Sequence, residues 1–272
     1  MKPFVKWVGG KRQLIEELIK RMPKDYDNYY EPFVGGGALF FEVQPDKARI
    51  NDFNICLINV YNQIRDNVDD LIKKLDKLAN KYNKLATKEE KADMFYSIRE
   101  KYNNGIKRKK LDTIQASYFI FLNKACFNGL YRVNANGLFN VPSGQKSKLN
   151  LYEEDNLRNI SELLNKTIIL SGDFEEACKD AKRGDFVFFD SPYYDTFDTY
   201  QKGGFELEDH IRLANLYKEL TDKGVYCMLT NSNTDFIKDL YKEYKIEVVN
   251  VKRLINRDAT NRKGEEVIIT NY

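Results

Sequence analysis

The feature that most constrains the fold is a run of large apolar residues, Phe186 to Phe189, which stops abruptly at Asp190. Continuous β-branched and aromatic residues are typical of a strand buried on both faces of a parallel sheet. Further strands and amphipathic helices alternate along the chain around it. Strands are expected near 47–52, 167–170, 225–230, 246–254 and 266–270, and helices over 207–223 and 234–244. This alternation predicts an α/β fold with a doubly wound sheet.

The four residues that follow this strand, Asp190-Ser191-Pro192-Tyr193, are of types that a buried strand does not need. Open α/β sheets bind ligands at the carboxyl ends of their strands. Pro192 fixes its own φ and biases Ser191 away from the α region, so the carbonyls beside Ser191 are held in place. A carboxylate and a fixed carbonyl suit the two N–H donors of a nucleobase amine, and a tyrosine ring can stack on the base. By itself the tetrapeptide also fits a type I turn.

Composition limits the class of protein and its partners. With 272 residues, of which 42% are hydrophobic and 31% charged, the chain is long enough for a large core. The net charge is only +3, so a nucleic-acid surface would have to be a local patch. No stretch has the length of a transmembrane helix, and the N-terminus lacks the apolar core of a signal peptide. We therefore expect a cytoplasmic protein with no membrane partner.

Cysteine and histidine usage argues against several kinds of site. The four cysteines, Cys56, Cys126, Cys178 and Cys227, are scattered without a C-x-x-C pair, which indicates reduced thiols rather than disulfides or zinc ligands. His210 is the single histidine. A Ser-His-Asp hydrolase and a histidine-ligated metal centre are therefore not expected, and carboxylates and backbone groups become the candidates for chemistry.

Near the N-terminus, the segment from Lys6 to Lys11 reads K-W-V-G-G-K and precedes an expected amphipathic helix. Two glycines and a lysine at a helix N-terminus can receive an anion, although the segment also fits a simple glycine turn. It is not a P-loop, because Val5 and Arg12 stand where a glycine and a serine or threonine are required.

A second glycine-rich segment, Glu31-Pro32-Phe33-Val34-Gly35-Gly36-Gly37, lies between an expected strand and an expected helix. This arrangement allows a nucleoside-bearing cofactor to approach the backbone closely. Phe40 replaces the third glycine of the dinucleotide fingerprint, which argues against pyrophosphate binding. Asp52 ends the next strand, where a carboxylate can accept hydrogen bonds from ribose hydroxyls. Asn51 and Asp52 could instead cap the helix that begins near Ile55.

From about residue 57 to 124 the chain is expected to be helical, with helices over 69–82 and 88–102. A basic loop is expected at 105–110, either as a solvated surface or as a phosphate contact. Next, Asn136-Gly137 between alternating segments predicts a β-hairpin over 127–142. Such a hairpin can enter a DNA groove, with arginine suited to guanine and asparagine to adenine. The helices and the hairpin are predicted to form an insertion between the second strand and the rest of the sheet.

Together and in this order, the motifs resemble those of Dam-type DNA adenine-N6 methyltransferases, the α-group of the D12 class I family. In that group the cofactor motifs precede the target-recognition region and the D-P-P-Y motif follows it. The matching blocks are Lys6-Trp7 through Lys11, Glu31-Pro32-Phe33-Val34-Gly35 with Gly37, Asp52, Asn128 to Pro142, and Asp190 to Tyr193. Here the first proline of D-P-P-Y is Ser191, which still supplies the backbone carbonyl.

The resemblance implies a Rossmann-like class I methyltransferase sheet, formed by residues 1–56 and 150–272, with an inserted helical target-recognition domain at 57–149 that bears the hairpin. It implies S-adenosylmethionine as methyl donor and no metal. The implied catalytic residues are Asp190, Ser191, Pro192 and Tyr193. The implied cofactor-binding residues are Trp7, Lys11, Phe33, Gly35, Gly37, Asp52, Asp173, Phe174 and Asp190. The implied DNA-binding residues are Lys6, Asn128, Leu130 and Arg132.

The expected reaction is methyl transfer to the N6 amine of adenine in double-stranded DNA, with GATC as the target and the base flipped out of the duplex. Alternatives are a different adenine context, an RNA or protein substrate for the same fold, or a non-catalytic DNA-binding module, which would have no reason to keep the glycine turn, Asp52 and the D-S-P-Y site together. A cognate restriction endonuclease is a further expected partner, genetically rather than physically associated.

Overall fold

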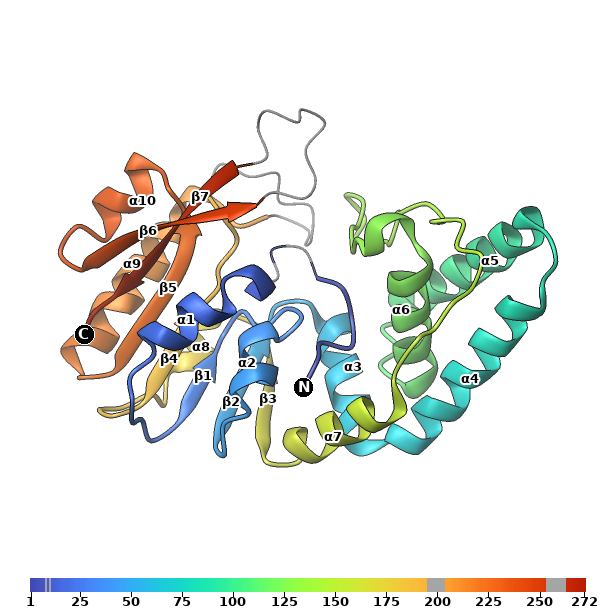
Figure 1. Ribbon diagram of the computed structural model, residues 1–272, viewed down its shortest axis with the longest axis horizontal. Coiled ribbons are helices and arrows are strands. Elements are labelled where there is room, and N and C mark those ends of the chain that lie inside the picture. The colour runs from blue at the N-terminus through green and yellow to red at the C-terminus, as the bar shows by residue number, and fades with distance from the viewer. Residues whose placement is uncertain (8, 10, 195–203, 253–262) are drawn as a thin grey trace.

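The structure of the 272-residue chain is a computed structural model that describes all residues except 8, 10, 195–203 and 253–262. A lobe built on a β-sheet and a lobe of helices lie side by side, and the N-terminal segment runs between them (Figure 1). Within the described residues the sheet has seven strands in the order β3-β2-β1-β4-β5-β7-β6. The strands are β1 Tyr29–Glu31, β2 Ala48–Asp52, β3 Thr167–Ser171, β4 Phe186–Phe189, β5 Tyr226–Ser232, β6 Lys245–Lys252 and β7 Lys263–Thr270.

The first five strands are parallel, whereas β7 is antiparallel to both β5 and β6. This confirms the predicted α/β class and its methyltransferase-like sheet. Leu254, at the end of the expected 246–254 strand, lies outside the described residues. Parallel strands place their carboxyl ends at one edge, so the ends of β1 to β5 share an edge where ligands can bind.

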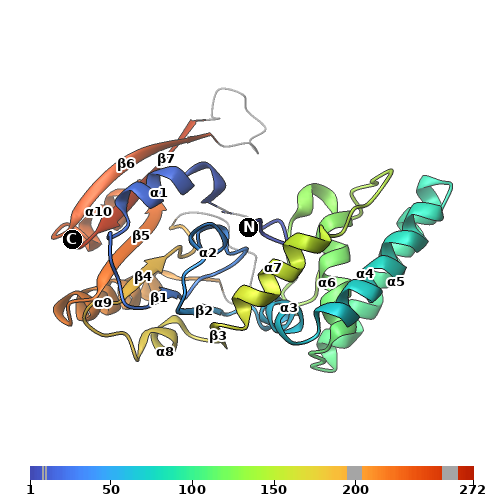
Figure 2. The same ribbon diagram turned by 60° about the horizontal axis from the view of Figure 1, so that its bottom comes forward.

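Side chains of β4 alternate between two apolar cores, as expected for a strand buried on both faces. Phe186 and Phe188 join the core on one face, while Val187 and Phe189 join the core on the other. All four are at most 1% exposed, and burying each one contributes about 1.5–3 kcal/mol. The second core is completed by α8 Phe174–Cys178, α9 Leu207–Asp222 and α10 Asp235–Leu240. The first includes residues of α1 Ile15–Arg21 and α2 Ala38–Val43 and continues into the helical lobe. Figure 2 shows the sheet lobe and the helical lobe side by side from a second direction.

The helical lobe is inserted between β2 and β3, as predicted. It contains α4 Val68–Lys84, α5 Lys88–Lys107 and α6 Thr113–Ala125, while α3 Ile55–Asp66 and α7 Glu154–Leu164 connect it to the sheet. Helix starts follow the capping rules: Thr87 and Glu90 form a capping box at α5, and Asp112 accepts from the Gln115 N–H at α6. No helix among the described residues is long and apolar enough to cross a membrane.

The expected basic loop at 105–110 is wrong in its first part, because Gly105 to Lys107 belong to α5. The reason is a close approach of two helices. A Cβ atom at Gly105 would lie only 2.0 Å from the Gln115 side-chain nitrogen on α6. Glycine is therefore required here for helix packing and not for a turn. Arg108 to Lys110 follow as an exposed turn.

The hairpin loop, residues 127–143, takes the place of a regular β-hairpin. It begins with the 3-10 turn η2 Phe127–Gly129 and is closed by two isolated antiparallel bridges, Val133 to Phe139 and Cys126 to Ser143. Phe139 bonds to the Asn103 side chain on α5 through both its N–H, at 2.9 Å, and its carbonyl, at 3.0 Å. These backbone groups face away from the opposite arm of the loop, whose own bonds run from Asn134 N–H to the Leu138 carbonyl and from Asn140 N–H to the Arg132 carbonyl. Asn103 therefore docks the outer edge of the loop onto α5.

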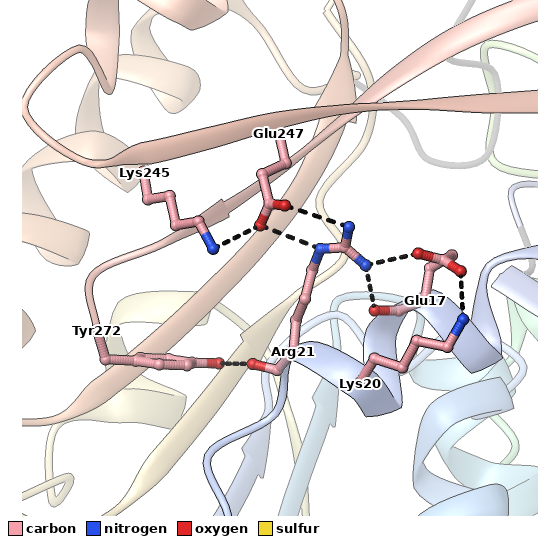
Figure 3. A network of polar contacts seen from close by, with 6 residues as sticks. All are labelled: Glu17, Lys20, Arg21, Lys245, Glu247 and Tyr272. Carbon is pink, nitrogen blue, oxygen red and sulfur yellow. Dashed lines mark hydrogen bonds and ion pairs between the residues drawn. The ribbon is translucent and has the colours of Figure 1, made fainter.

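Helix α1 is fixed to the far edge of the sheet by a polar network (Figure 3). The Arg21 guanidinium bonds to Glu17 on its own helix at 2.7 Å and to Glu247 on β6 at 3.2 Å. The Tyr272 hydroxyl donates to the Arg21 carbonyl at 2.8 Å. Partly exposed ion pairs contribute only about 0–1 kcal/mol each, so the network matters mainly for position. It holds the helix that follows Lys11.

Candidate active site

Four polar residues meet where the strand order changes direction, between β1 and β4. Glu31, Asp52 and Asn231 lie at the carboxyl ends of β1, β2 and β5, and Asp190 directly follows β4. Ligands of open α/β sheets bind in the crevice at this switch point. The tertiary structure therefore brings the motifs that are far apart in sequence to one edge of the sheet.

The Asp190 carboxylate is held by two donors on its Oδ1 atom. Lys11 Nζ lies 2.7 Å away and the Thr230 hydroxyl donates at 2.9 Å. Lys11 is only 5% exposed; its Nζ also donates to the Gly9 carbonyl at 3.0 Å and lies 4.3 Å from the centre of the Tyr193 ring. Lys11 was predicted near the cofactor, and the structure places it directly against the predicted catalytic carboxylate.

Residues after Asp190 are fixed from the opposite side. The Tyr193 hydroxyl donates to Glu266 on β7, and the Asn231 side chain bonds to Ser191 and to the Pro192 carbonyl. Burial, together with the charges of Asp190 and Glu266, raises the pKa of Tyr193 well above its usual value. The phenol therefore stays protonated and remains a donor across the physiological pH range. The four predicted catalytic residues thus form one rigid segment.

Glu31 is a second acid at this edge, and it is 2% exposed. The Tyr29 hydroxyl donates to it at 2.6 Å. Burial raises the pKa of Glu31 to about 8, which the hydrogen bond from Tyr29 partly offsets, and the charge of Asp190 adds to the rise. Glu31 is therefore mostly neutral at pH 7, and the ion pair at this edge is that of Lys11 with Asp190.

The glycine turn and Asp52 form the second part of the site. The Gly35 N–H donates to Asp52 Oδ2 at 3.0 Å, and the Tyr61 hydroxyl donates to the Gly35 carbonyl at 2.9 Å. A Cβ atom at Gly35 would lie 2.6 Å from the Trp7 ring, and one at Gly37 would lie 2.8 Å from the Tyr61 hydroxyl. Both glycines also have positive φ, so side chains are excluded on two counts.

Helix capping by Asp52 was an open alternative, and the structure decides it. Asn54 is the N-cap of α3, with its side chain accepting from the Cys56 and Leu57 N–H groups. Asp52 instead accepts from the Gly35 and Asn54 N–H groups. Burial raises the pKa of Asp52 to about 6, although these two hydrogen bonds oppose the rise. Its carboxylate is thus organised around the glycine turn.

An aromatic cluster borders the site beyond β3. The Phe33 and Phe174 rings lie 5.3 Å apart, and Phe205 is within 5.9 Å of both. Asp173 caps α8, and Arg212 bonds to its carboxylate at 2.9 Å while lying 4.9 Å from the centre of the Phe174 ring. Phe33, Asp173 and Phe174 are therefore brought together, as the resemblance implies.

Asn123 of α6, which is fully buried, joins Lys6 to the turn that contains Asn128, two of the predicted DNA-contacting residues. The Asn123 side chain bonds to the N–H and carbonyl of Lys6, both at 2.9 Å, and to the Gly129 carbonyl at 3.1 Å. Lys6 and Asn128 are both exposed. Their segments are in close contact, because a Cβ atom at Gly129 would lie 2.4 Å from the Lys6 side chain. Leu130 and the exposed Arg132 follow along the same loop, and Arg132 donates to Asn140 at 2.8 Å.

Trp7 joins the two lobes. Its ring covers the Gly35 turn and stacks on Tyr131 of the hairpin loop, with ring centres 5.4 Å apart. Tyr131 in turn stacks on Phe119 of α6 at 4.9 Å. Each such aromatic pair contributes about 0.5–1.5 kcal/mol beyond its area burial. The stack fixes the hairpin loop relative to the glycine turn.

Sequence reasoning missed several residues of the site. Thr230 and Asn231 follow the apolar part of β5 just as Asp190 follows β4, so the same strand-end signal could have found them. Glu266 lies on the antiparallel strand β7, and Asn123 lies inside a buried helix. No local pattern distinguishes these two from ordinary structural residues.

Comparison with known proteins gives the family. The model of the D12 class N6 adenine-specific DNA methyltransferases matches residues 7–255, and the chain belongs to this family. The chain is 40% identical to the type II methyltransferase M1.LlaDCHI of Lactococcus lactis subsp. cremoris, covering 100% of this chain and 96% of the relative. It is 38% identical to the type II methyltransferase M.MjaIII of Methanocaldococcus jannaschii, covering 100% and 99%. It is 30% identical to a DNA adenine methylase of Serratia marcescens, covering 99% and 97%.

The protein is therefore an adenine-specific DNA methyltransferase that acts on DNA, and enzymes of this family use S-adenosylmethionine.

Proposed function

We propose that this enzyme methylates N6 of adenine within GATC in duplex DNA, after flipping the base into the site formed by Asp190 to Tyr193. The observation that supports the chemistry best is the fixed pair of acceptors at the end of β4. Lys11 and Thr230 both contact Asp190 Oδ1. We assign the second carboxylate oxygen and the Ser191 carbonyl to the two N–H bonds of the target amine. Tyr193 supplies an aromatic face for the base.

The residues around the glycine turn fit S-adenosylmethionine. Gly35 and Gly37 allow Trp7 and Tyr61 to pack closely on the turn, and Asp52, which accepts from the Gly35 N–H, offers a carboxylate for the ribose hydroxyls. Phe33, Phe174 and Asp173 fit a planar adenine that carries an amine. Trp7 and Lys11 complete the proposed cofactor site. When bound, the cofactor supplies an electrophilic methyl group.

Catalysis in this proposal depends on positioning and electrostatics. Two acceptors on the amine favour a pyramidal nitrogen, whose lone pair then points out of the plane of the base. Lys11 and Thr230 keep the Asp190 carboxylate in one orientation, so little reorganisation is needed as charge develops on the nitrogen. The Tyr193 hydroxyl donates to Glu266, which keeps the Tyr193 ring in place.

We assign target recognition to residues 57–149 and catalysis to 1–56 with 150–272. Lys6 lies against Gly129, next to Asn128, and Leu130 and Arg132 follow on the same loop, which supports a role for these residues in reading the bases. Phe127, at the start of this loop, is 54% exposed. GATC is proposed from the resemblance of these positions, and the relatives include both DNA adenine methylases and type II methyltransferases.

The test incubates purified protein with S-adenosylmethionine and unmethylated plasmid DNA, then maps N6-methyladenine by modification-sensitive sequencing. We expect modification confined to GATC. Methyladenine in another context would reject the specificity and keep the chemistry. No methyladenine, despite measured cofactor binding, would reject the proposal. A duplex with 2-aminopurine at the target adenine tests base flipping, because its fluorescence should rise on binding.

Two of the relatives are named type II methyltransferases, and we propose that a restriction endonuclease of the same specificity accompanies this enzyme genetically. Protection of methylated plasmid from a GATC-cleaving endonuclease would show that the enzyme can serve this role, and a gene for such an endonuclease beside the gene for this enzyme would support the association. The same plasmid treated with enzyme but no S-adenosylmethionine is the control, and cleavage of both samples alike would contradict the proposal.

A further inference from the structure

The carboxyl end of β5 forms a buried support for the catalytic tetrapeptide. Thr230, Asn231 and Ser232 are 0%, 1% and 7% exposed, although all three are polar. A buried polar side chain is tolerated only when its hydrogen bonds are satisfied. In this case the partners lie in and just after the Asp190 to Tyr193 segment.

Both the nitrogen and the oxygen of the Asn231 side-chain amide form hydrogen bonds. Its Nδ2 donates to the Ser191 hydroxyl at 3.2 Å and to the Pro192 carbonyl at 3.4 Å. Its Oδ1 accepts from the Tyr194 N–H at 3.0 Å and from the Ser232 N–H at 2.8 Å. The Ser232 hydroxyl adds a bond to the Tyr194 carbonyl at 3.0 Å. One side chain therefore contacts the tetrapeptide at two points and its C-terminal neighbour at a third.

These contacts decide which backbone carbonyl is left for the substrate. The Pro192 carbonyl is turned toward β5 and bonded to Asn231. The carbonyl before it, that of Ser191, is the one the proposed mechanism requires. In the D-P-P-Y pattern a proline at position 191 would restrict φ at that residue. Ser191 lacks this restriction, but its hydroxyl is tied to Asn231 and it is only 2% exposed.

We propose that Asn231 is a positioning residue for methyl transfer. Its bond to the Ser191 hydroxyl replaces the rigidity of the missing proline, and its bond to Pro192 directs the Ser191 carbonyl to the target amine. This inference rests on the proposed function, because it requires that carbonyl to accept from adenine. Asn231 acts through the tetrapeptide and does not itself contact the base.

The central variant is Asn231→Asp, which keeps the size and the acceptor for Tyr194 but removes both donors. Misplacing a reacting group by about 1 Å can cost about a hundredfold in rate. We therefore expect kcat to fall about a hundredfold while KM for S-adenosylmethionine and for DNA changes less than about threefold. Single-turnover methyl transfer to a GATC duplex measures the chemical step directly.

The matched control is Asn271→Asp at the opposite end of β5. Asn271 is built in the same way: its Nδ2 donates to Thr221 Oγ1 and to the Val225 carbonyl, and its Oδ1 accepts from the Cys227 N–H. Because Asn271 is half-buried and Asn231 is buried, Asn271→Asp should lower the melting temperature less than Asn231→Asp does, and it should leave kcat within about threefold of wild type. An equal loss of kcat in both variants would mean general destabilisation and overturn the proposal.

Ser191→Ala removes the hydroxyl that accepts from Asn231 and keeps the backbone carbonyl of residue 191. We expect about a tenfold fall in kcat from this variant, since only one of the two bonds is lost. Combined with Asn231→Asp it should add less than about threefold, because coupled residues are not additive. Wild-type kcat in Asn231→Asp overturns the proposal. Should that variant fail to fold, unchanged kcat in Ser191→Ala does so. Failure of the proposed function would appear earlier, as absence of adenine methylation by the wild-type enzyme.

Discussion

The Asp190 to Tyr193 segment and the hairpin loop both follow regular elements, but different kinds of contact hold them. Side chains from three other segments, Lys11, Thr230 with Asn231, and Glu266, fix the catalytic segment. The hairpin loop is fixed at its base, through Asn123, Asn103 and the stack on Tyr131, while Asn128 and Arg132 remain exposed. The difference teaches that the groups we propose for chemistry are held from several sides, whereas the groups we propose to read DNA are displayed on a docked loop.

Asp190→Ala should have the largest effect and tests whether methyl transfer and DNA binding depend on different regions. We expect kcat to fall at least about a thousandfold, because one of the two acceptors on the amine is lost. Duplex DNA affinity should stay within a few-fold, since binding depends mainly on phosphate contacts and the hairpin loop. Methyl-transfer and DNA-binding assays measure the two effects. Asp180→Ala, which removes the exposed partner of Arg49, is the control, and wild-type turnover in Asp190→Ala would refute the assignment.

Next in size is the effect of Tyr131→Ala on the joint between the two regions. Tyr131 is 4% exposed and stacked between Trp7 and Phe119, so truncation should lower the free energy of unfolding by about 3–5 kcal/mol. Tyr131→Phe keeps the stack and loses the hydroxyl that bonds to Tyr102, which should cost about 1 kcal/mol. Denaturant unfolding compares the two. Equal losses would show that the hydroxyl, and not the stack, holds the loop.

Arg132→Ala should have the opposite effect to Asp190→Ala, weakening DNA binding and sparing methyl transfer. We expect binding to the target duplex to weaken by about 1–3 kcal/mol and selectivity to relax at one base pair, with kcat at saturating DNA nearly unchanged. Sequencing of methylated plasmid and binding to duplexes with one substituted base pair measure both. The control is Arg158→Ala on α7. Arg158 pairs with Asp69 of α4 and Glu154 of α7, and its loss should change neither DNA binding nor selectivity. A large fall in kcat would show that the two regions are not separable.

The smallest expected effect is the pH dependence of cofactor binding. The pKa of Asp52 is raised to about 6, so its carboxylate becomes protonated as the pH falls below that value. A protonated group accepts ribose hydroxyls poorly, and S-adenosylmethionine affinity should fall by up to about tenfold per pH unit below 6. Calorimetric titration between pH 5 and 8 checks this. Asp52→Asn should bind weakly with a flat profile, and the same slope in that variant would assign the titration to another group.

Much of the fold could be predicted from the sequence because its signals are local. The apolar run Phe186 to Phe189, the caps at Thr87 and Asp112, and the glycine turn at Gly35 each depend on near neighbours in the chain. The prediction failed at Gly105, where a glycine in a basic segment indicated a loop. In the structure Gly105 lies within α5 and allows close packing against Gln115 of α6. The predicted hairpin was also too regular, because the loop has two isolated bridges in place of a continuous ladder and is docked onto α5 through Asn103.

By itself the sequence determined the alternating α/β pattern, the order of the motifs and the kinds of groups at the strand ends, since these follow from residue type and spacing. The tertiary structure alone decided that Lys11 pairs with Asp190 and that Asn231 and Glu266 support the Asp190 to Tyr193 segment. Those contacts join residues up to 179 positions apart, Lys11 to Asp190 (190 − 11 = 179). Only the closing of the sheet brings such residues together, and no local pattern records which partner a buried polar group will find.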